Sequence, residues 1–182
     1  MNNNISYNTW FNTWERLFNS KIIIKGKLDS WEKNCPKEPG FYLFTCPTIP
    51  LPEKYLKIGI GQGKEKGLRG RLKTHFEGKI KPKFGSILND RLGRTISKNG
   101  ITEYSRRDIY LGNYVLKKYN KDLTKINDRL WFLEEKCIVQ IITCEELFKK
   151  YGTLKPVEKK IEEFLKSSLD VRLIKGYEPQ PF

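Results

Sequence analysis

The segment CIVQIIT, at residues 137–143, constrains the fold more than any other stretch of this sequence. It is the strongest β-prone run in the chain, and its apolar residues follow one another without the alternation of a half-exposed strand. A strand of that kind is covered on both faces. We therefore expect residues 137–143 to form the central strand of a sheet that has helices on both sides.

Two further β-prone segments lie earlier in the chain. GFYLFT follows a stretch broken by prolines, and YLKIGIG follows the proline-rich segment PTIPLP. Because prolines interrupt strands and favour turns or sheet edges, the two segments are separated by a connection and not by a continuous strand. The sequence predicts an antiparallel hairpin with strands at residues 41–46 and 55–60.

Three segments have the apolar spacing of helices with one buried face. The first spans residues 6–20, the second follows the glycine-rich loop and runs to about Glu77, and the third begins near Pro156. Their apolar positions are Trp10, Phe11, Trp14, Leu17 and Phe18; Leu68, Leu72 and Phe76; and Val157, Ile161, Phe164 and Leu165. The hydrophobic patterns are weaker between residues 78 and 125, where we expect one helix near residues 105–119.

The chain is strongly basic. Its 182 residues include 35 lysines and arginines against 21 acidic residues, which gives a net charge of +14. Residues 64–125 hold 17 of the basic residues and 6 of the acidic ones. Such a concentration suits a polyanion such as nucleic acid, although a solvated lysine-rich face gives the same count.

Several classes of protein are not expected. No apolar run approaches the roughly 20 residues of a membrane span, and the start lacks a secretion signal, so we expect a cytoplasmic protein without membrane contact. The loop IGIGQGKEKG fits neither common phosphate-binding glycine pattern, so no nucleotide cofactor is expected. The cysteines form no CxxC pair and the only histidine is His75, which favours buried reduced thiols over a zinc site. These cysteines are Cys35, Cys46, Cys137 and Cys144.

A few polar residues have side chains that could act in catalysis. Arg71 and His75 are four residues apart on one predicted helix face, where an arginine and a proton-transferring histidine suit a phosphate. Tyr42 and Lys57 lie on the two hairpin strands, and Glu158 lies in the first turn of the last helix. Each also has an ordinary structural explanation, namely a surface arginine, strand packing, or a favourable helix-dipole contact.

The order of these motifs resembles the GIY-YIG nuclease family. GFY at residues 40–42 corresponds to the first triplet, and KIG at residues 57–59 corresponds to the second, with lysine in place of the family's tyrosine. RLKTH then supplies Arg71 and His75, and PVEKKIEEFL supplies the acidic Glu158.

The resemblance is close over about residues 38–77 and loose over about 136–166. It implies one α/β (α+β) domain with a small three-stranded antiparallel sheet flanked by helices. The nuclease core would comprise about residues 38–77 and 136–170. The N-terminal helix, residues 6–20, and a basic insertion at about residues 78–135 would be additions to this core.

The resemblance also implies an activity, namely metal-dependent hydrolysis of DNA phosphodiester bonds. Glu158 would hold Mg²⁺, or Mn²⁺, a hard cation that prefers carboxylates, water and phosphate oxygens. Tyr42 would activate the attacking water, with Lys57 nearby to lower the pKa of its phenol. Arg71 would stabilise the charge on the phosphorus centre, and His75 would orient water, phenol or phosphate.

Among the members of this family, a type II restriction enzyme is the expected kind, because no separate DNA-binding module is visible. Cleavage of both strands of double-stranded DNA by one site per chain suggests a homodimer that matches a palindrome. The expected DNA contacts are Arg69, Lys73, Arg91, Arg94, Arg106 and Arg107. Two alternatives remain: an inactive DNA- or RNA-binding module, which Lys57 favours, and a nicking or repair nuclease of a phage or mobile element.

Overall fold

The computed structural model describes a sheet, the helices that cover it, and part of the predicted insertion. The described residues are 5–25, 33–48, 55–63, 67–76, 96–97, 100–101, 114–123 and 125–169. The predicted DNA contacts Arg91, Arg94, Arg106 and Arg107 lie outside the described residues.

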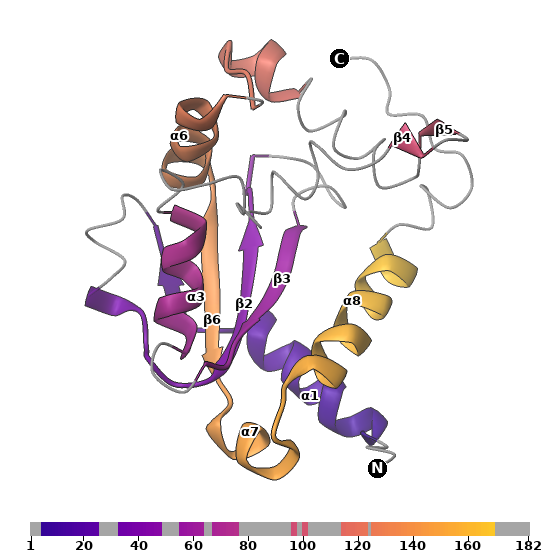
Figure 1. The fold of residues 1–182 in the computed structure, drawn as a ribbon. Helices are drawn as coiled ribbons and strands as arrows, with labels where there is room; N and C mark the ends of the chain where they lie inside the picture. The colour runs from indigo at the N-terminus through magenta and orange to yellow at the C-terminus, as the bar shows by residue number, and fades with distance from the viewer. Residues whose placement is uncertain are drawn as a thin grey trace.

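A four-stranded antiparallel sheet forms the centre of the fold, in the strand order β1-β6-β2-β3 (Figure 1). Its strands are β1 (Ile22–Ile24), β2 (Gly40–Thr45), β3 (Tyr55–Gly61) and β6 (Ile138–Thr143). The predicted interior strand is confirmed, since β6 lies between β1 and β2. The expected number of three strands is wrong by one: β1 pairs along the edge of β6 that would otherwise present unpaired backbone groups.

β2 and β3 form the predicted antiparallel hairpin. In their register Tyr42 lies opposite Gly59, and Phe44 lies opposite Lys57. Directly paired residues of an antiparallel sheet share a face, so the cross-strand neighbour of the Tyr42 ring is a residue without a side chain. The pairing becomes irregular after Phe44.

Helices α3 (Gly67–Phe76) and α6 (Ile126–Lys136) cover the face of the sheet onto which Tyr42 projects (Figure 1). Leu68 and Leu72, which belong to the predicted apolar stripe of α3, are both buried. Their burial turns the opposite side of α3 toward solvent. Of the described polar side chains of this helix, that of Arg71 is exposed, and those of Arg69 and Lys73 are half-buried.

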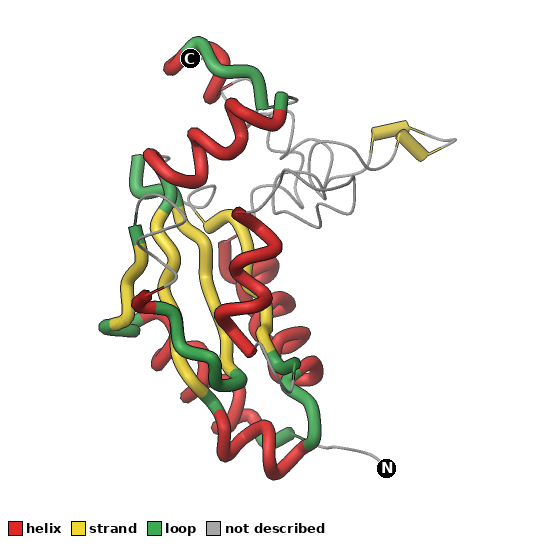
Figure 2. The backbone as a smooth tube through the Cα atoms, turned by 60° about the vertical axis from the view of Figure 1, so that its left-hand side comes forward, coloured by secondary structure: helices red, strands yellow, loops and turns green. Residues whose placement is uncertain are grey.

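Helices α1 (Tyr7–Phe18) and α8 (Lys155–Leu169) cover the other face, and Figure 2 shows the sheet between the two helical layers. The two helices contact each other through aromatic rings. Phe164 lies 5.3 Å from Trp10 and 5.9 Å from Trp14, measured between ring centroids. The predicted N-terminal helix is thus an integral part of this layer.

The short helix α7 (Glu145–Tyr151) connects β6 to α8. It ends at Gly152, whose φ of 69° is left-handed and typical of a helix C-terminus. Beyond this turn Leu154, Val157 and Ile161 are fully buried and Phe164 is half-buried. The predicted apolar stripe of α8 is thus confirmed at Val157 and Ile161, while the side chain of Leu165 lies outside the described part of the structure. None of the helices in the described part of the chain combines the length and the apolar character needed to cross a membrane.

The predicted insertion, residues 78–135, contains parts of different kinds. Strands β4 (Ile96–Ser97) and β5 (Gly100–Ile101) form a small antiparallel pair. Of the helix expected near residues 105–119, the described part, residues 114–119, is helical. The last residues of the insertion belong to α6, which contributes to the core beside α3.

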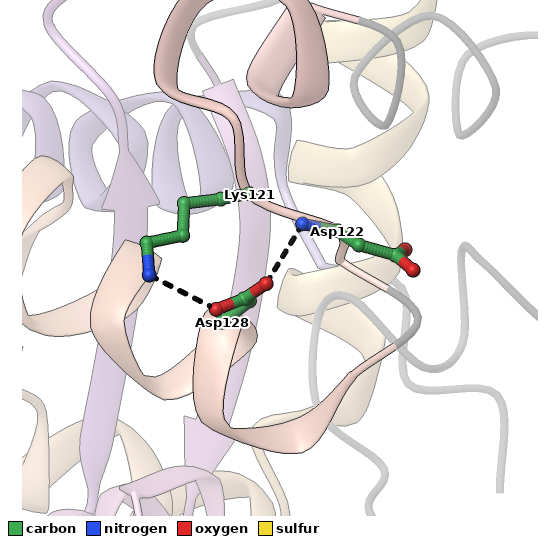
Figure 3. A network of polar contacts seen from close by, with 3 residues as sticks. All are labelled: Lys121, Asp122 and Asp128. Atoms are coloured by element: carbon green, nitrogen blue, oxygen red, sulfur yellow. Dashed lines mark hydrogen bonds and ion pairs between the residues drawn. The ribbon is translucent and has the colours of Figure 1, made fainter.

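A polar network joins the segment that follows the helix at residues 114–119 to α6 (Figure 3). The connection begins at Asn120, whose φ of 52° is left-handed. The carboxylate of Asp128 accepts a hydrogen bond of 2.9 Å from the backbone N–H of Asp122 and contacts Nζ of Lys121 at 3.2 Å. The backbone hydrogen bond, followed by Lys121, lowers the pKa of Asp128 and keeps its charge near the start of α6.

Candidate active site

An open cleft of about 580 Å³ lies at the free edge of β3, where the two helical layers meet. The end of β3 and the two residues that follow it, Gln62 and Gly63, form its floor, while α3 and α8 supply its walls. The polar side chains that line it are Tyr42, Gln62, Arg71, Lys155, Glu158 and Glu162. Residues from β2, α3 and α8 thus converge on one concave surface.

Tyr42 reaches this cleft across the neighbouring strand. Its side chain is fully buried, and its ring packs edge-on against Phe44 with a centroid separation of 5.6 Å. A Cβ atom at Gly59 would overlap the phenol oxygen and the ring of Tyr42. The absence of a side chain at residue 59 is therefore what lets the hydroxyl of Tyr42 lie over β3, near the cleft.

Arg71 projects from the first half of α3, and its side chain is exposed. The start of this helix is fixed by the preceding chain: Leu68 N–H donates to Glu38 O at 3.2 Å, and Arg69 N–H donates to Pro36 O at 2.9 Å. The Nε of Arg69 also donates to the carbonyl oxygen of Cys35 at 2.8 Å. A rigidly held helix end places the guanidinium of Arg71 beside the cleft.

Glu158 and Glu162 lie one turn apart on α8, and both are partly exposed in the cleft. Lys155, on the preceding turn, is exposed and also lines it. Carboxylates four residues apart share one face of a helix, so both can face the same small ion. Arg71 lies on the other wall, which α3 forms. Two acidic and two basic side chains therefore line a single cleft.

Gln62 connects the floor of the cleft to the wall formed by α8. Its Oε1 accepts a hydrogen bond of 2.8 Å from the backbone N–H of Leu154, and its amide group lies 3.3 Å from the hydroxyl of Thr153. Leu154 immediately precedes α8. The side chain thus spans the gap between the end of β3 and the first residues of the helix that carries both carboxylates.

Three of the five predicted catalytic residues, Tyr42, Arg71 and Glu158, line this cleft. Lys57 lies in β3 and His75 lies in α3, but the positions of their side chains fall outside the described part of the structure. Their predicted roles stay predictions.

The predicted DNA contacts of α3 lie away from the cleft lining. Arg69 binds the carbonyl oxygen of Cys35, as described above, and Lys73 is half-buried. Both residues remain part of the basic segment. Contacts with DNA at these positions stay predictions.

The cleft residues that the motifs did not indicate are Gln62, Lys155 and Glu162. Glu162 could have been found, because it follows Glu158 by one helical turn in the segment VEKKIEEFL. Gln62 gave no such signal, since its partner Leu154 is 92 positions away in the chain. Only the folded chain brings these two residues together.

The buried cysteines are unsuited to nucleophilic chemistry. All four are buried, as predicted, and they are Cys35, Cys46, Cys137 and Cys144. Burial raises the pKa of Cys35 to about 12 and that of Cys144 to about 11. Since the thiolate is the reactive form, these two thiols remain protonated and inert near neutral pH.

Carboxylate and cationic side chains lie together in the cleft. Among the described residues, no cluster of three or more histidine, cysteine or acidic side chains is present. Mg²⁺ often takes only one or two carboxylates and completes its coordination with water and phosphate oxygens. Glu158 and Glu162 match that need, and Arg71 and Lys155 offer positive charge for a phosphate.

Comparisons of this chain with protein-family models, with curated proteins and with solved structures found no match. We therefore infer the function from the residues of the cleft and from the sequence motifs that contain them.

Proposed function

We propose that this protein is a metal-dependent endonuclease that hydrolyses phosphodiester bonds of double-stranded DNA. The observation that carries the proposal is the convergence of Tyr42, Arg71 and Glu158 on one cleft from a strand and two helices. These residues come from the motifs that resemble the GIY-YIG nucleases. A phenol, a guanidinium and a carboxylate are the groups that this chemistry needs at one phosphate.

The cleft suits a resident Mg²⁺ or Mn²⁺ ion. Glu158 would hold the ion, and Glu162, one turn further along α8, is placed to share its charge or orient its waters. When bound, such an ion polarises the scissile phosphate and stabilises the leaving 3′ oxygen. The open side of the cleft leaves room for water and phosphate oxygens as the remaining ligands.

The chain's own residues would act on the water and the phosphate. Tyr42, as its phenolate, would accept a proton from the attacking water and become the neutral phenol, and a charged Lys57 beside it would favour the phenolate by lowering the pKa of the phenol. Arg71 would bind the non-bridging oxygens as negative charge develops on them. His75, one turn after Arg71 on α3, would orient the water or the phosphate.

DNA is the substrate that the charge favours. The concentration of lysine and arginine in residues 64–125 lies directly after β3 in the chain and includes Arg71 of the cleft. Arg91, Arg94, Arg106 and Arg107 of this segment would contact bases or phosphates and give sequence preference. A homodimer would bring one cleft to each strand of a palindromic site, as in a type II restriction enzyme.

Digestion of plasmid and phage DNA tests this function. Wild type is expected to release discrete fragments only when Mg²⁺ or Mn²⁺ is present, and Tyr42→Phe is expected to release few or none. DNA binding by both proteins should weaken steeply as the salt concentration rises, because phosphate contacts release counterions. Salt-sensitive binding without product in either metal would contradict the proposal and favour a catalytically inactive binding module.

A further inference from the structure

The start of α8 is attached to the end of β3 through one side chain. The carbonyl-type oxygen of Gln62 accepts the N–H of Leu154 at 2.8 Å, which also fixes which end of the amide faces the helix. The hydroxyl of Thr153 lies 3.3 Å from the same amide group and accepts the N–H of Lys155 at 3.3 Å. Two successive residues before α8 are therefore hydrogen-bonded to Gln62.

This attachment leads directly to the carboxylate of the cleft. Leu154 accepts the backbone N–H of Glu158 at 3.0 Å, in the first turn of α8. Leu154 is also fully buried, so its backbone has little freedom to move independently of the core. Gln62, Leu154 and Glu158 thus form a short chain of hydrogen bonds from the strand end to the first turn of the helix.

The same side chain lines the cleft, next to the glycines that form its floor. Tyr42 is fixed relative to β3 by its close approach to Gly59, whereas Glu158 belongs to a helix on the other face of the sheet. The distance between phenol and carboxylate therefore depends on how the start of α8 is held against the end of β3. Gln62 is a described side chain that hydrogen-bonds across this gap.

We propose that Gln62 is a positioning residue: it holds the first turn of α8 so that Glu158 keeps its place opposite Tyr42 and Arg71. This role rests on the proposed nuclease function. Gln62 acts through Leu154 and Glu158 and does not itself contact the reacting atoms. Groups that orient a metal ligand typically change metal affinity or activity by about 10–100-fold when they are removed.

Three substitutions separate the hydrogen bond from other properties of this side chain. Gln62→Leu removes the acceptor, and Gln62→Asn keeps an amide but shortens the side chain by one methylene, so that it no longer reaches Leu154. Gln62→Glu keeps the length and the acceptor oxygen. Gln140→Leu is the matched control, because Gln140 is also hydrogen-bonded to the backbone of another element: its side-chain amide donates to the carbonyl oxygen of Phe18, between β6 and α1 and away from the cleft.

Two measurements on the full-length variants test the role. The first is the Mg²⁺ concentration that gives half-maximal plasmid cleavage, and the second is amide hydrogen exchange of residues 153–158 without metal. Gln62→Leu and Gln62→Asn should need about tenfold more Mg²⁺ or higher and should exchange faster at Leu154. Gln62→Glu should keep wild-type exchange at Leu154, and Gln140→Leu should resemble wild type in both measurements.

The outcomes distinguish this role from the function on which it rests. Unchanged Mg²⁺ dependence, or unchanged exchange at Leu154, in both Gln62→Leu and Gln62→Asn would overturn the positioning role while wild type still cleaves. An equal rise in Mg²⁺ requirement in Gln140→Leu would also overturn it, since the effect would then reflect general stability. Absence of cleavage by wild type in either metal would overturn the nuclease function itself and, with it, a role in catalysis.

Discussion

The two edges of the sheet differ in what they expose. β1 has three residues, and its Ile22 and Ile23 are 38% and 49% exposed, so this edge presents isolated apolar side chains to solvent. The β3 edge instead meets a helix from each face, α3 on one and α8 on the other, and polar side chains converge between them. In this molecule the polar-lined cleft lies at the edge that both helical layers reach.

Substitution of Glu158, at the β3 edge, is expected to have the largest effect on cleavage. Glu158→Gln removes the charge that would hold the cation, and we expect cleavage to fall about 1,000-fold or more, because the metal supplies several kcal/mol of transition-state stabilisation. Single-turnover cleavage of a plasmid at saturating enzyme measures this loss.

Glu163→Gln is the matched control for that substitution. Glu163 lies on the same helix, is 50% exposed, and contacts Lys159 and Lys160 outside the cleft. Because exposed ion pairs contribute little, cleavage and stability should stay close to those of wild type. Equal losses in Glu158→Gln and Glu163→Gln would show that the cleft has no special role.

The two arginines of α3, Arg69 and Arg71, are expected to differ in their effects on cleavage and on stability. Arg71→Ala is expected to reduce cleavage about 100-fold or more, since it removes charge stabilisation of the phosphate, and to leave the thermal midpoint nearly unchanged. Arg69→Ala is expected to lower stability by about 1.5–3 kcal/mol, because it breaks the charged hydrogen bond to Cys35. Cleavage assays beside urea unfolding should show the larger loss of cleavage in Arg71→Ala and the larger loss of stability in Arg69→Ala, and a reversal of this order would refute these assignments.

Two glycines of the β3 edge offer a smaller and more local test. Gly59→Ala places a methyl group against the ring of Tyr42, so we expect cleavage to fall and stability to drop by about 1–3 kcal/mol from overpacking. Gly63→Ala adds the same methyl group where, apart from its chain neighbours, no atom of the described residues lies within 4 Å, and it should have little effect on either quantity. Similar cleavage by both variants would mean that the position of Tyr42 does not matter.

The smallest effect is expected at the opposite edge. Ile23→Lys changes a residue that is 49% exposed, and we expect a change in unfolding free energy within about 0.5 kcal/mol and unaltered cleavage. Urea unfolding and plasmid cleavage check both expectations. Loss of cleavage in a folded Ile23→Lys protein would contradict the expectation that the β1 edge takes no part in cleavage.

The sequence was most informative where one hydrophobic pattern extends over a whole element. The uninterrupted run at residues 137–143 identified the interior strand, and the spacing of Val157 and Ile161 identified the buried side of α8. β1 was missed because three consecutive isoleucines, Ile22–Ile24, are too few to show a period. Its place follows from the unpaired edge of β6, which is a property of the sheet and not of the segment.

The candidate site was predictable only in part, for a related reason. Short motifs indicated Tyr42, Arg71 and Glu158, because each motif is local in the chain. The hydrogen bond between Gln62 and Leu154 depends on how β3 and α8 meet in space, and no local pattern encodes it. Glu162 lies between these cases, since helical spacing relates it to Glu158 but does not show that this side of α8 faces a cleft.

The location of bound Mn²⁺ tests the central claim, that the β3 edge is the site where a metal ion and a phosphate meet. Mn²⁺ broadens the NMR signals of nearby amides, so a titration of the full-length protein maps its position without requiring DNA. We predict selective broadening at Gly61, Arg71 and Glu158, with Ile22 and Ile23 unaffected and the effect at Gly61 lost in Glu158→Gln. Broadening centred elsewhere, or equal at both edges and unchanged in Glu158→Gln, would contradict the account.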